Sequence, residues 1–330
     1  MGKISAIIIT VIIFLLGFFY WGILPKEPSS NKTIVFAVQK GEGNEEFSSN
    51  LEKLGIIKNK YVFQIYVLIN RKYLKLQAGK YLLSPAMGIP QIINKFVLGD
   101  VVKIEITIPE GFTLVQIENE INAKKEKNTE IKLSDKKLGD YKKDYQFLKD
   151  APDNSSLEGY LFPDTYKISY DANADAIIRT MLNNFNKKLT QTLRDEIAKQ
   201  KKSVFEVITM ASLIEKEVKT IEDKKIVSGI LWKRLSVNMP LQVDATITYI
   251  TGKKTTKVSI IETQIDSPYN TYKYKGLPEG PISNPGLESI IAAIYPKESV
   301  FWYYLSGIDG LTVFSKTLKQ HNTNIRTWLR

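Results

Sequence analysis

The sequence predicts an α+β fold behind a single transmembrane helix. Three observations support this: a long uncharged segment near the N-terminus, strand and helix patterns that alternate up to about residue 100, and a long C-terminal part in which helical patterns alternate with Gly- and Pro-rich loops. The chain has 330 residues, of which 43% are hydrophobic and 25% charged. This composition is globular, and the length suits two or three modules with cores of their own.

The first element is an apolar segment, Ile4–Leu24, that predicts a membrane-spanning helix. It carries no charge, is long enough to cross a bilayer, and places Tyr20 and Trp21 where interfacial aromatic residues belong. A cleaved signal peptide is the alternative, but signal sequences have shorter apolar regions and no small-residue cleavage site follows this one. We therefore expect residues 1–32 to form an uncleaved anchor and linker, with the rest of the chain outside the cytoplasmic membrane.

Residues 33–100 predict a small βααβ unit with an added helix. Ile34, Phe36 and Val38 lie on one face of the first strand. Two helical patterns follow, the first ended by Gly55, and then a turn and a second strand over "LQAGKYLLS". The segment "GIPQIINKFVLGD" predicts a short helix that ends at Gly99.

Residues 101–150 are expected to connect this unit to the main domain. A strand over 101–111 and a helix over 113–123 precede a segment, 124–150, that is dense in Lys, Asp and Glu. This charged segment indicates a surface excursion or short solvated helices, without chemistry of its own. Residues 151–330 form the predicted main domain, with helical stretches over 172–200 and 203–237.

Composition limits the chemistry that is available. The chain has no Cys, one His (His321) and no GxSxG motif, which excludes disulfides, thiolate catalysis and His-rich metal sites. We expect no metal and no cofactor, and acid–base work must fall to Asp, Glu, Lys or Tyr. The net charge of +11 suits an acidic polymer, anionic lipid or nucleic acid. A location outside the membrane argues against nucleic acid.

The stretch "TMASLIEKEV", Thr209–Val218, combines an apolar helical pattern with two carboxyl groups. At about 100° per residue, Glu215 falls in the middle of the apolar stripe, whereas Glu217 falls on the opposite side. Burial should raise the pKa of the Glu215 carboxyl, and a general acid needs a carboxyl that keeps its proton. Glu217 is interpreted as an ordinary charge that faces away.

Two alternatives remain for this helix. Glu215 could be a structural carboxylate that is paired with a Lys or Arg. Ser212 and Lys216, one turn apart, could instead form a hydrolytic Ser-Lys dyad, but their spacing misses the S-x-x-K pattern.

Three further segments are rich in side chains that suit a glycan. They are "LEGYLFPDTY" (157–166), "LQVDATITYI" (241–250) and the long Pro/Gly-rich loop 266–286. An extended 241–250 segment would place Gln242, Asp244 and Thr246 on one strand face. The alternative is that the tyrosines of these segments only fill a core. The candidate substrate-binding residues are Glu158, Tyr160, Glu217, Gln242, Asp244, Tyr269, Asn270, Thr271, Tyr272 and Asn284.

Taken in order, these motifs resemble the YceG-like family of membrane-anchored lytic transglycosylases, the endolytic murein transglycosylases. The matching segments are "LEGYLFPDTY", "ASLIEKE", "LQVDATITY", "SPYNTYKYKGLPEGPISNPG" and "FSKTLKQHN". The resemblance implies that Glu215, the first Glu of "EKE", is the catalytic acid. It also implies a LysM-like module over 33–100 and a mixed α+β YceG-like catalytic domain over 151–330.

The implied reaction cleaves the β-1,4 bond between N-acetylmuramic acid and N-acetylglucosamine within nascent peptidoglycan strands. The 6-hydroxyl of the muramyl residue is the nucleophile, so the product ends in a 1,6-anhydro ring and strand length is limited. The resemblance implies peptidoglycan, the cell membrane and its peptidoglycan synthases as partners. The alternatives are an inactive peptidoglycan-binding scaffold of the same fold, a hydrolytic muramidase and the Ser-Lys peptidase.

Overall fold

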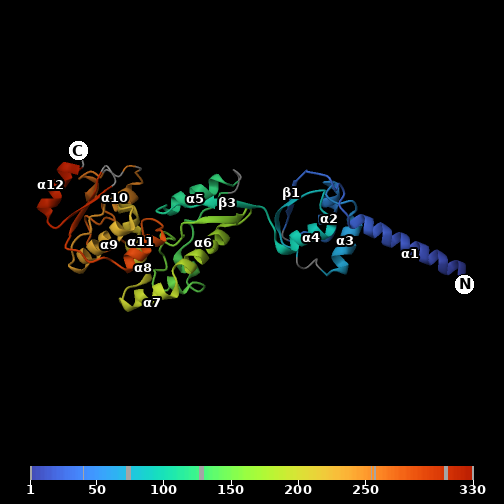
Figure 1. The fold of residues 1–330 in the computed structure, drawn as a ribbon, viewed down its shortest axis with the longest axis horizontal. Coiled ribbons are helices and arrows are strands. Elements are labelled where there is room, and N and C mark those ends of the chain that lie inside the picture. Colours follow the sequence, from blue (N-terminus) through green and yellow to red (C-terminus); the bar gives the residue numbers. More distant parts are fainter. Residues whose placement is uncertain are drawn as a thin grey trace. The chain divides into compact units, whose positions relative to one another are not determined.

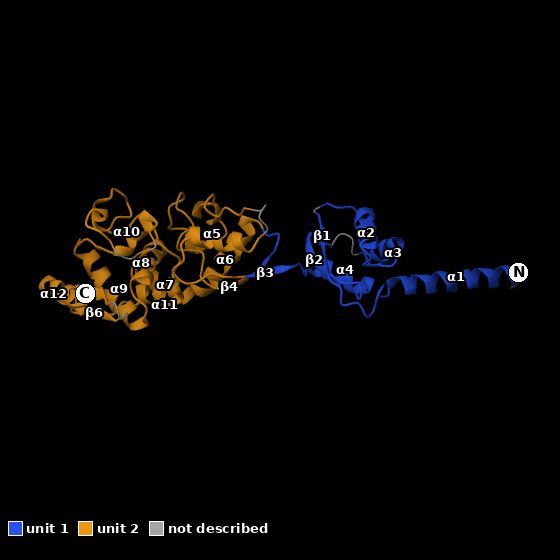
Figure 2. Cartoon of the chain, turned by 90° about the horizontal axis from the view of Figure 1, so that it is seen from above, with its two compact units in different colours: residues 1–105, 167–172 blue, residues 106–166, 173–330 orange. Residues whose placement is uncertain are grey.

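The computed structural model describes residues 2–39, 41–71, 76–125, 130–253, 255, 258–307 and 311–328. Figure 1 labels the helices and strands, and Figure 2 colours two compact units. Unit 1 comprises Met1–Glu105 and Lys167–Ala172, and unit 2 comprises Ile106–Tyr166 and Asn173–Arg330.

The N-terminal helix α1 (Gly2–Ile23) confirms the predicted apolar helix. Over Lys3–Ile23 it is long and apolar enough to cross a membrane, and no other helix of the described residues meets that test. Most of its large apolar side chains are exposed. Such a surface is suited to lipid, because exposed apolar area of this extent is unfavourable in water.

Unit 1 has the predicted βααβ order with an added helix. Its elements are β1 (Ile34–Val38), α2 (Asn44–Lys53), α3 (Lys60–Ile69), β2 (Gly79–Leu83) and α4 (Ile89–Leu98). The two strands pair antiparallel, with Phe36 opposite Tyr81. The ring of Phe96 lies 4.9 Å from that of Phe47 and 4.6 Å from that of Tyr81, at the centre of an apolar core. Gly99 ends α4 with a φ of 65°, a conformation that favours glycine.

Unit 2 is mainly helical, and α8 lies in its core. Helix α8 packs against α7, α9, α10 and α11. The strands β3 and β4 pair with each other, and β5 pairs antiparallel with β6. The elements from β3 onward are β3 (Lys103–Thr107), α5 (Leu114–Ala123), η2 (Leu138–Tyr141), η3 (Gln146–Leu148), β4 (Thr165–Ser169), α6 (Ala174–Lys188), α7 (Gln191–Lys199), α8 (Val204–Glu217), α9 (Ile221–Ser236), α10 (Asp244–Thr251), η4 (Glu262–Gln264), α11 (Leu287–Ile294), β5 (Tyr303–Ser306), β6 (Thr312–Ser315) and α12 (Leu318–Trp328).

Each of the two long helical stretches predicted from the sequence is divided in the structure. The stretch over 172–200 forms α6 and α7, and the stretch over 203–237 forms α8 and α9. Thr190 caps the start of α7 and Thr220 caps the start of α9, each through its side-chain oxygen. Threonine at these positions satisfies backbone N–H groups that a new helix leaves unpaired.

Two other expectations are corrected. The segment 241–250 is not a strand, because α10 starts at Asp244. The charged segment 124–150 is not only a solvated surface: its described part contains η2 and η3, which bury Leu138, Tyr141, Phe147 and Leu148. The apolar residues between the charges supply these core contacts, whereas residues 126–129 lie outside the described residues.

Candidate functional site

Helix α8 positions both glutamates of the "EKE" motif. Ser203 starts the helix with a capping box, in which its side chain accepts from Glu206 N while the Glu206 carboxylate accepts from Ser203 N. From Val207 to Ile214 every residue is buried. Glu215 follows directly on this buried run, and only 9% of its side chain is exposed. The predicted burial of Glu215 is therefore confirmed.

The Glu215 carboxyl accepts from three donors, two at the start of α11 and one on α9. Oε2 accepts from the backbone N of Gly286 at 3.0 Å and from Ser289 Oγ at 2.7 Å. Oε1 lies 3.5 Å from Lys224 Nζ, on α9, and only 3% of the Lys224 side chain is exposed. The ion pair expected of a structural carboxylate is thus present, and burial alone does not distinguish that role from catalysis.

Two more carboxyl groups surround this ion pair. Glu288, on α11, lies 3.8 Å from Lys224 Nζ. Glu110 follows β3 in the chain, and its pKa is raised by burial and by the negative charge of Glu215. Glu110 is not among the site residues predicted from the sequence; the available signal is its place directly before Gly111, at the end of a predicted strand.

A pair of loops carries these groups and is fixed by backbone hydrogen bonds. Gly111 N donates to Asn284 O at 2.9 Å, and Asn284 N donates to Phe112 O at 2.8 Å. Lys216 Nζ reaches across from α8 to Gly111 O at 3.2 Å. Gly111 has a φ of 75°, a left-handed conformation that favours glycine at this turn.

Beneath the loops, Glu158 is a buried carboxyl that holds three segments together. Its exposure is 2%, and both of its oxygens lie 3.0 Å from Leu114 N at the start of α5. Oε1 also accepts from Asn284 Nδ2 at 2.8 Å, and the carboxyl is hydrogen-bonded to Tyr249. Burial raises the pKa of Glu158 to about 8, because removal from water disfavours the charged form.

Five of the predicted substrate-binding residues are buried, and contact with a glycan is closed to them in this structure. Asn270 illustrates their role: its Nδ2 donates to Thr263 O at 3.0 Å and to Ile265 O at 2.7 Å, so it folds its own loop. Thr271 Oγ1 accepts from Val243 N at 3.0 Å and ties that loop to the start of α10. The five residues are Glu158, Tyr160, Asn270, Thr271 and Asn284.

A second polar cluster forms where α8 ends. Glu217 is hydrogen-bonded to Tyr304 on β5 and to the backbone N of Ala245 in the first turn of α10. Burial, followed by the negative charge of Asp244, raises the pKa of Glu217 to about 7. The expectation of an ordinary, outward-facing Glu217 is therefore wrong, because α10 and β5 cover that side of the helix end.

Asp244 and Tyr272 complete the second cluster. The Tyr272 hydroxyl donates to Asp244 Oδ1. Asp244 is exposed at the first turn of α10, yet its carboxyl is partly removed from water by its neighbours, and this desolvation raises the pKa of the carboxyl. Gln242 is also exposed and adopts a φ of 52° just before the helix. Exposed and half-exposed polar groups here are open to a ligand, in contrast to the five buried residues.

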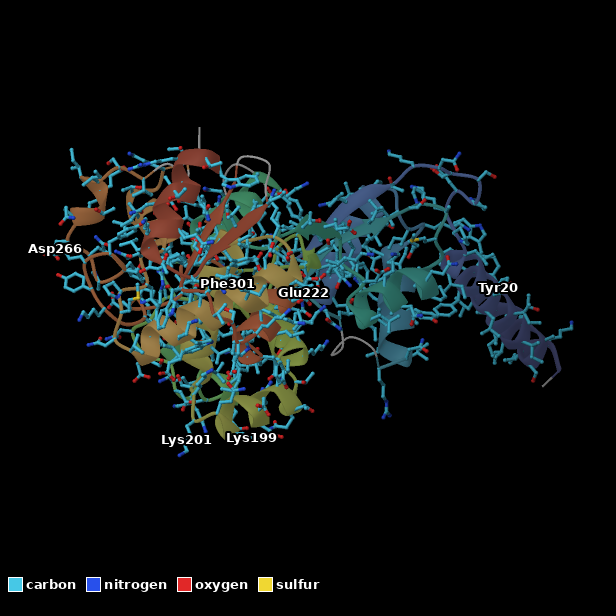
Figure 3. All side chains as sticks on the ribbon, turned by 60° about the vertical axis from the view of Figure 1, so that its left-hand side comes forward. Tyr20, Lys199, Lys201, Glu222, Asp266 and Phe301 are labelled. Carbon is cyan, nitrogen blue, oxygen red and sulfur yellow. The ribbon has the colours of Figure 1, made fainter. Side chains whose placement is uncertain are left out.

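Arg234 and an aromatic pair connect the second cluster to the β5–β6 hairpin. Arg234 is 5% exposed, and it donates to Trp302 O at 2.9 Å and to Leu241 O at 2.7 Å. Next to Trp302, the ring of Phe301 stacks on that of Phe314 at 5.4 Å between centroids, and Phe301 is labelled in Figure 3. These contacts join the β5–β6 hairpin to the helices that carry the site.

The Ser-Lys dyad is not formed. Ser212 is fully buried, and its hydroxyl donates to Thr209 O at 2.7 Å and accepts from Ile282 N at 3.0 Å. Lys216 instead reaches Gly111 O. A nucleophile with these contacts is neither accessible nor paired with a base.

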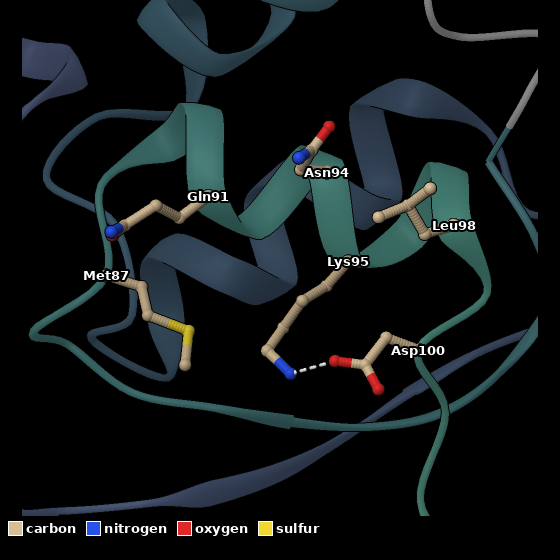
Figure 4. Close-up of a pocket in the computed structure, with 6 residues that line it drawn as sticks. All are labelled: Met87, Gln91, Asn94, Lys95, Leu98 and Asp100. Atoms are coloured by element: carbon tan, nitrogen blue, oxygen red, sulfur yellow. Dashed lines mark hydrogen bonds and ion pairs between the residues drawn. The ribbon is translucent and has the colours of Figure 1, made fainter.

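A pocket also lies in unit 1, on the α4 side. Figure 4 shows its lining and the ion pair of Lys95 Nζ with Asp100 Oδ2, 2.5 Å apart. None of its lining residues is among the predicted site residues. The lining consists of Met87, Gln91, Asn94, Lys95, Leu98 and Asp100.

Comparison with known proteins places these clusters in a family. The chain is 37% identical over 318 residues to the endolytic murein transglycosylase of Bacillus subtilis (strain 168), with 90% of this chain and 85% of that protein covered. It is 30% identical over 362 residues to the protein of the same name from Streptococcus pneumoniae (strain D39), with 98% of this chain covered but 65% of the longer pneumococcal protein.

A solved structure agrees with these relatives. The crystal structure of a yceG-like protein from Listeria monocytogenes is similar with a TM-score of 0.61 and 37% identity, over 89% of this chain and 99% of that chain. The model of the YceG-like family matches residues 36–327, which include Glu110 and both polar clusters of α8. The chain therefore belongs to the YceG-like family.

Proposed function

We propose that this chain is an endolytic peptidoglycan lytic transglycosylase, a lyase that cleaves between N-acetylmuramic acid and N-acetylglucosamine. The observation that carries the proposal is the Glu215 carboxyl, almost enclosed yet adjacent to exposed Glu110 and Glu288. The relatives named endolytic murein transglycosylases support the substrate class.

In the proposed mechanism Glu215 handles a single proton in two steps. As a carboxylic acid it donates its proton to the oxygen that leaves with N-acetylglucosamine as the C1–O bond breaks. As a carboxylate it then takes the proton from the muramyl 6-hydroxyl while that oxygen bonds to C1. The proton count of the enzyme is restored, and no water enters the product. One carboxyl can serve because the nucleophile belongs to the substrate, unlike in two-carboxylate glycosidases.

The accessible members of the second cluster are proposed to bind the glycan. Asp244, Gln242, Tyr269 and Tyr272 offer hydrogen bonds and flat aromatic faces on exposed or half-exposed positions. Glu217 is proposed to contribute a partly protonated carboxyl at neutral pH. The buried residues Glu158, Tyr160, Asn270, Thr271 and Asn284 are proposed to support the loops that carry these groups.

The remaining parts are proposed to place the enzyme at newly made glycan. Helix α1 would anchor the chain in the cytoplasmic membrane, with residues 33–100 as a LysM-like module, 101–150 as a connecting segment and 151–330 as the catalytic domain, all outside the cytoplasm. Cleavage within strands close to the membrane would limit their length, and peptidoglycan synthases would be neighbours there. The order of elements in unit 1 supports a compact module between anchor and catalytic domain.

Product analysis tests the proposal. Wild-type protein in detergent is expected to release muropeptides with 1,6-anhydro ends from purified peptidoglycan, and Glu215→Gln is expected to lose at least about 100-fold in rate, since it cannot transfer a proton. Glu217→Gln should retain product formation with weaker binding. Glu298→Gln, at an exposed position outside both clusters, is the matched control.

The alternatives give distinct results. Reducing muramyl ends that are one water heavier would indicate a muramidase, and binding without any product would indicate an inactive scaffold. If Glu217→Gln is inactive while Glu215→Gln retains its rate, the acid is Glu217 and the assignment to Glu215 is refuted.

A further inference from the structure

Helix α3 carries an apolar face that the described residues of unit 1 leave exposed. The side chains of this face are 46% to 68% exposed, and they are those of Tyr61, Ile65, Leu68 and Ile69. At about 100° per residue they lie within about 100° of one another, on the side of the helix opposite to buried Phe63. Single exposed apolar residues are common on soluble proteins, whereas a continuous apolar face along one helix indicates an interaction surface.

Helix α1 joins unit 1 directly beside this face. Gly22, in the last turn of α1, is buried against α3, and a Cβ built on it would lie 2.7 Å from Val62 Cγ2. Val62 borders Ile69 on the surface of α3, about 20° away around the helix. Lys58 Nζ, just before α3, donates to Trp21 O at 2.9 Å and lies 4.6 Å from the centroid of the Trp21 ring. Figures 1 and 2 show α3 beside this end of α1.

The length of α1 sets the depth at which α3 lies when α1 spans a bilayer. The 21 residues of Lys3–Ile23 extend over about 31 Å at 1.5 Å per residue, which matches the thickness of the hydrocarbon core. The last turn of α1 therefore lies at the boundary between acyl chains and headgroups, where Trp21 is a typical residue. Because Gly22 of that turn contacts α3, helix α3 lies at the same boundary.

The composition of α3 is that of a helix that lies in a membrane interface. The helix contains no acidic residue, and its one charged residue, Lys60, is in the first turn. Lys60 Nζ lies 5.1 Å from the ring centroid of Tyr61, the first residue of the apolar face. Lys58 precedes the face and Arg71 follows it. Helices with this pattern place their apolar face among the upper acyl chains and their cations near anionic headgroups. At ten residues α3 is too short to cross the bilayer.

We propose that the exposed face of α3 is a second membrane contact, through which unit 1 lies on the lipid bilayer that α1 crosses. Tyr61, Ile65, Leu68 and Ile69 enter the interface beside the last turn of α1. The inference rests on the proposed anchoring of the chain by α1. A single membrane helix leaves the attached unit free to turn about the helix axis. A second contact to one side of that axis stops this rotation and fixes which face of unit 1 is turned towards the membrane.

The test measures the contact of α3 with acyl chains in the full-length protein. Because the chain has no Cys, one introduced Cys is the only thiol that a fluorophore can label. Leu68→Cys and, separately, Ile65→Cys are labelled and reconstituted into vesicles of phosphatidylglycerol and phosphatidylcholine, with and without bromine on the acyl chains. Bromine quenches a fluorophore only on close contact, so we expect both labels to lose intensity in the brominated vesicles. Both positions are exposed, so their replacement leaves the core of unit 1 intact.

Two further labels serve as controls. Leu98→Cys is the matched control, since Leu98 is an apolar side chain of the same unit and is 72% exposed. Leu98 ends α4 on the side of unit 1 from which the chain continues to β3, away from α1 (Figure 2). Its label should keep the same intensity in both kinds of vesicle. Ile12→Cys, at an exposed position in the middle of α1, should be quenched because α1 crosses the bilayer.

The outcomes separate the inference from the anchor on which it rests. Quenching at Ile12 but at neither position of α3 overturns the inference, and the proposed anchor then still stands. An unquenched label at Ile12 overturns the anchor and the inference with it. Quenching at Leu98 equal to that at Leu68 also overturns the inference, since the lipid contact is then not specific to α3. A Leu68→Cys label that brominated lipid leaves unquenched, and that gains access to water as the protein is diluted with lipid, shows instead that a second copy of the chain covers α3.

Discussion

The buried carboxyl of Glu158 should make unit 2 less stable as pH rises. Its ordinary pKa of 4.5 is raised to about 8 by burial, so the folded state binds a proton that the unfolded chain has released. The stabilisation is fully present below about pH 4.5 and is lost as pH rises through about 8. At about 1.4 kcal/mol per pKa unit, the loss between pH 4 and pH 9 is about 5 kcal/mol.

Glu158→Gln removes this dependence of stability on pH and retains the shape of the side chain. The amide oxygen can accept from Leu114 N and Asn284 Nδ2, the donors that now serve Glu158. At pH 5 the variant should lie within about 1 kcal/mol of wild type, the usual scale for one altered hydrogen bond. At pH 8.5 it should be more stable than wild type by several kcal/mol, because it has no charge to bury.

Urea unfolding followed by tryptophan fluorescence measures this difference. Trp232 is a suitable reporter for unit 2, since its Nε1 donates to Ala293 O at 3.0 Å and Lys202 Nζ lies 3.8 Å from its ring centroid. Glu217, whose pKa is about 7, acts in the same direction but is present in both proteins and cancels in the comparison. If wild type and Glu158→Gln show parallel stability curves from pH 5 to pH 8.5, the reasoning is refuted.

Two further changes test the packing and the second cluster. Gly229→Ala, inside α9, would normally stabilise a helix by about 1 kcal/mol, but here its Cβ would lie 2.1 Å from Lys297 O, a backbone atom. We therefore expect the free energy of unfolding to fall by about 1–3 kcal/mol, measured as a lower melting temperature. A higher melting temperature would show that Gly229 does not lie against Lys297 O. Tyr272→Phe removes the donor to Asp244 and should raise the pKa of Asp244 further. The variant should bind intact peptidoglycan more weakly than wild type in a pull-down assay, with an unchanged melting temperature. Binding equal to that of wild type at all pH values would contradict the role of this pair.

Much of the fold follows from local pattern. The helix boundaries in unit 1 agree with the sequence because capping residues and glycines, such as Gly99, act within a few residues of the helix they end. Periodicity failed for Glu217, since a helical wheel describes one helix and takes no account of what covers its end. It failed also at Asp244, where β-branched residues suggest a strand but contacts with the 266–286 loop and a helix C-cap at Gly252 favour α10.

The sequence by itself determined the apolar N-terminal helix, the order of elements in unit 1 and the burial of Glu215, because each depends on the spacing of apolar residues along one segment. Only the tertiary structure decided which groups surround that carboxyl. Ser289, Gly286 and Glu110 lie 71 or more residues from Glu215 along the chain. Their interactions with the Glu215 carboxyl depend on separations of a few ångströms, which the folded loops set and no local pattern contains.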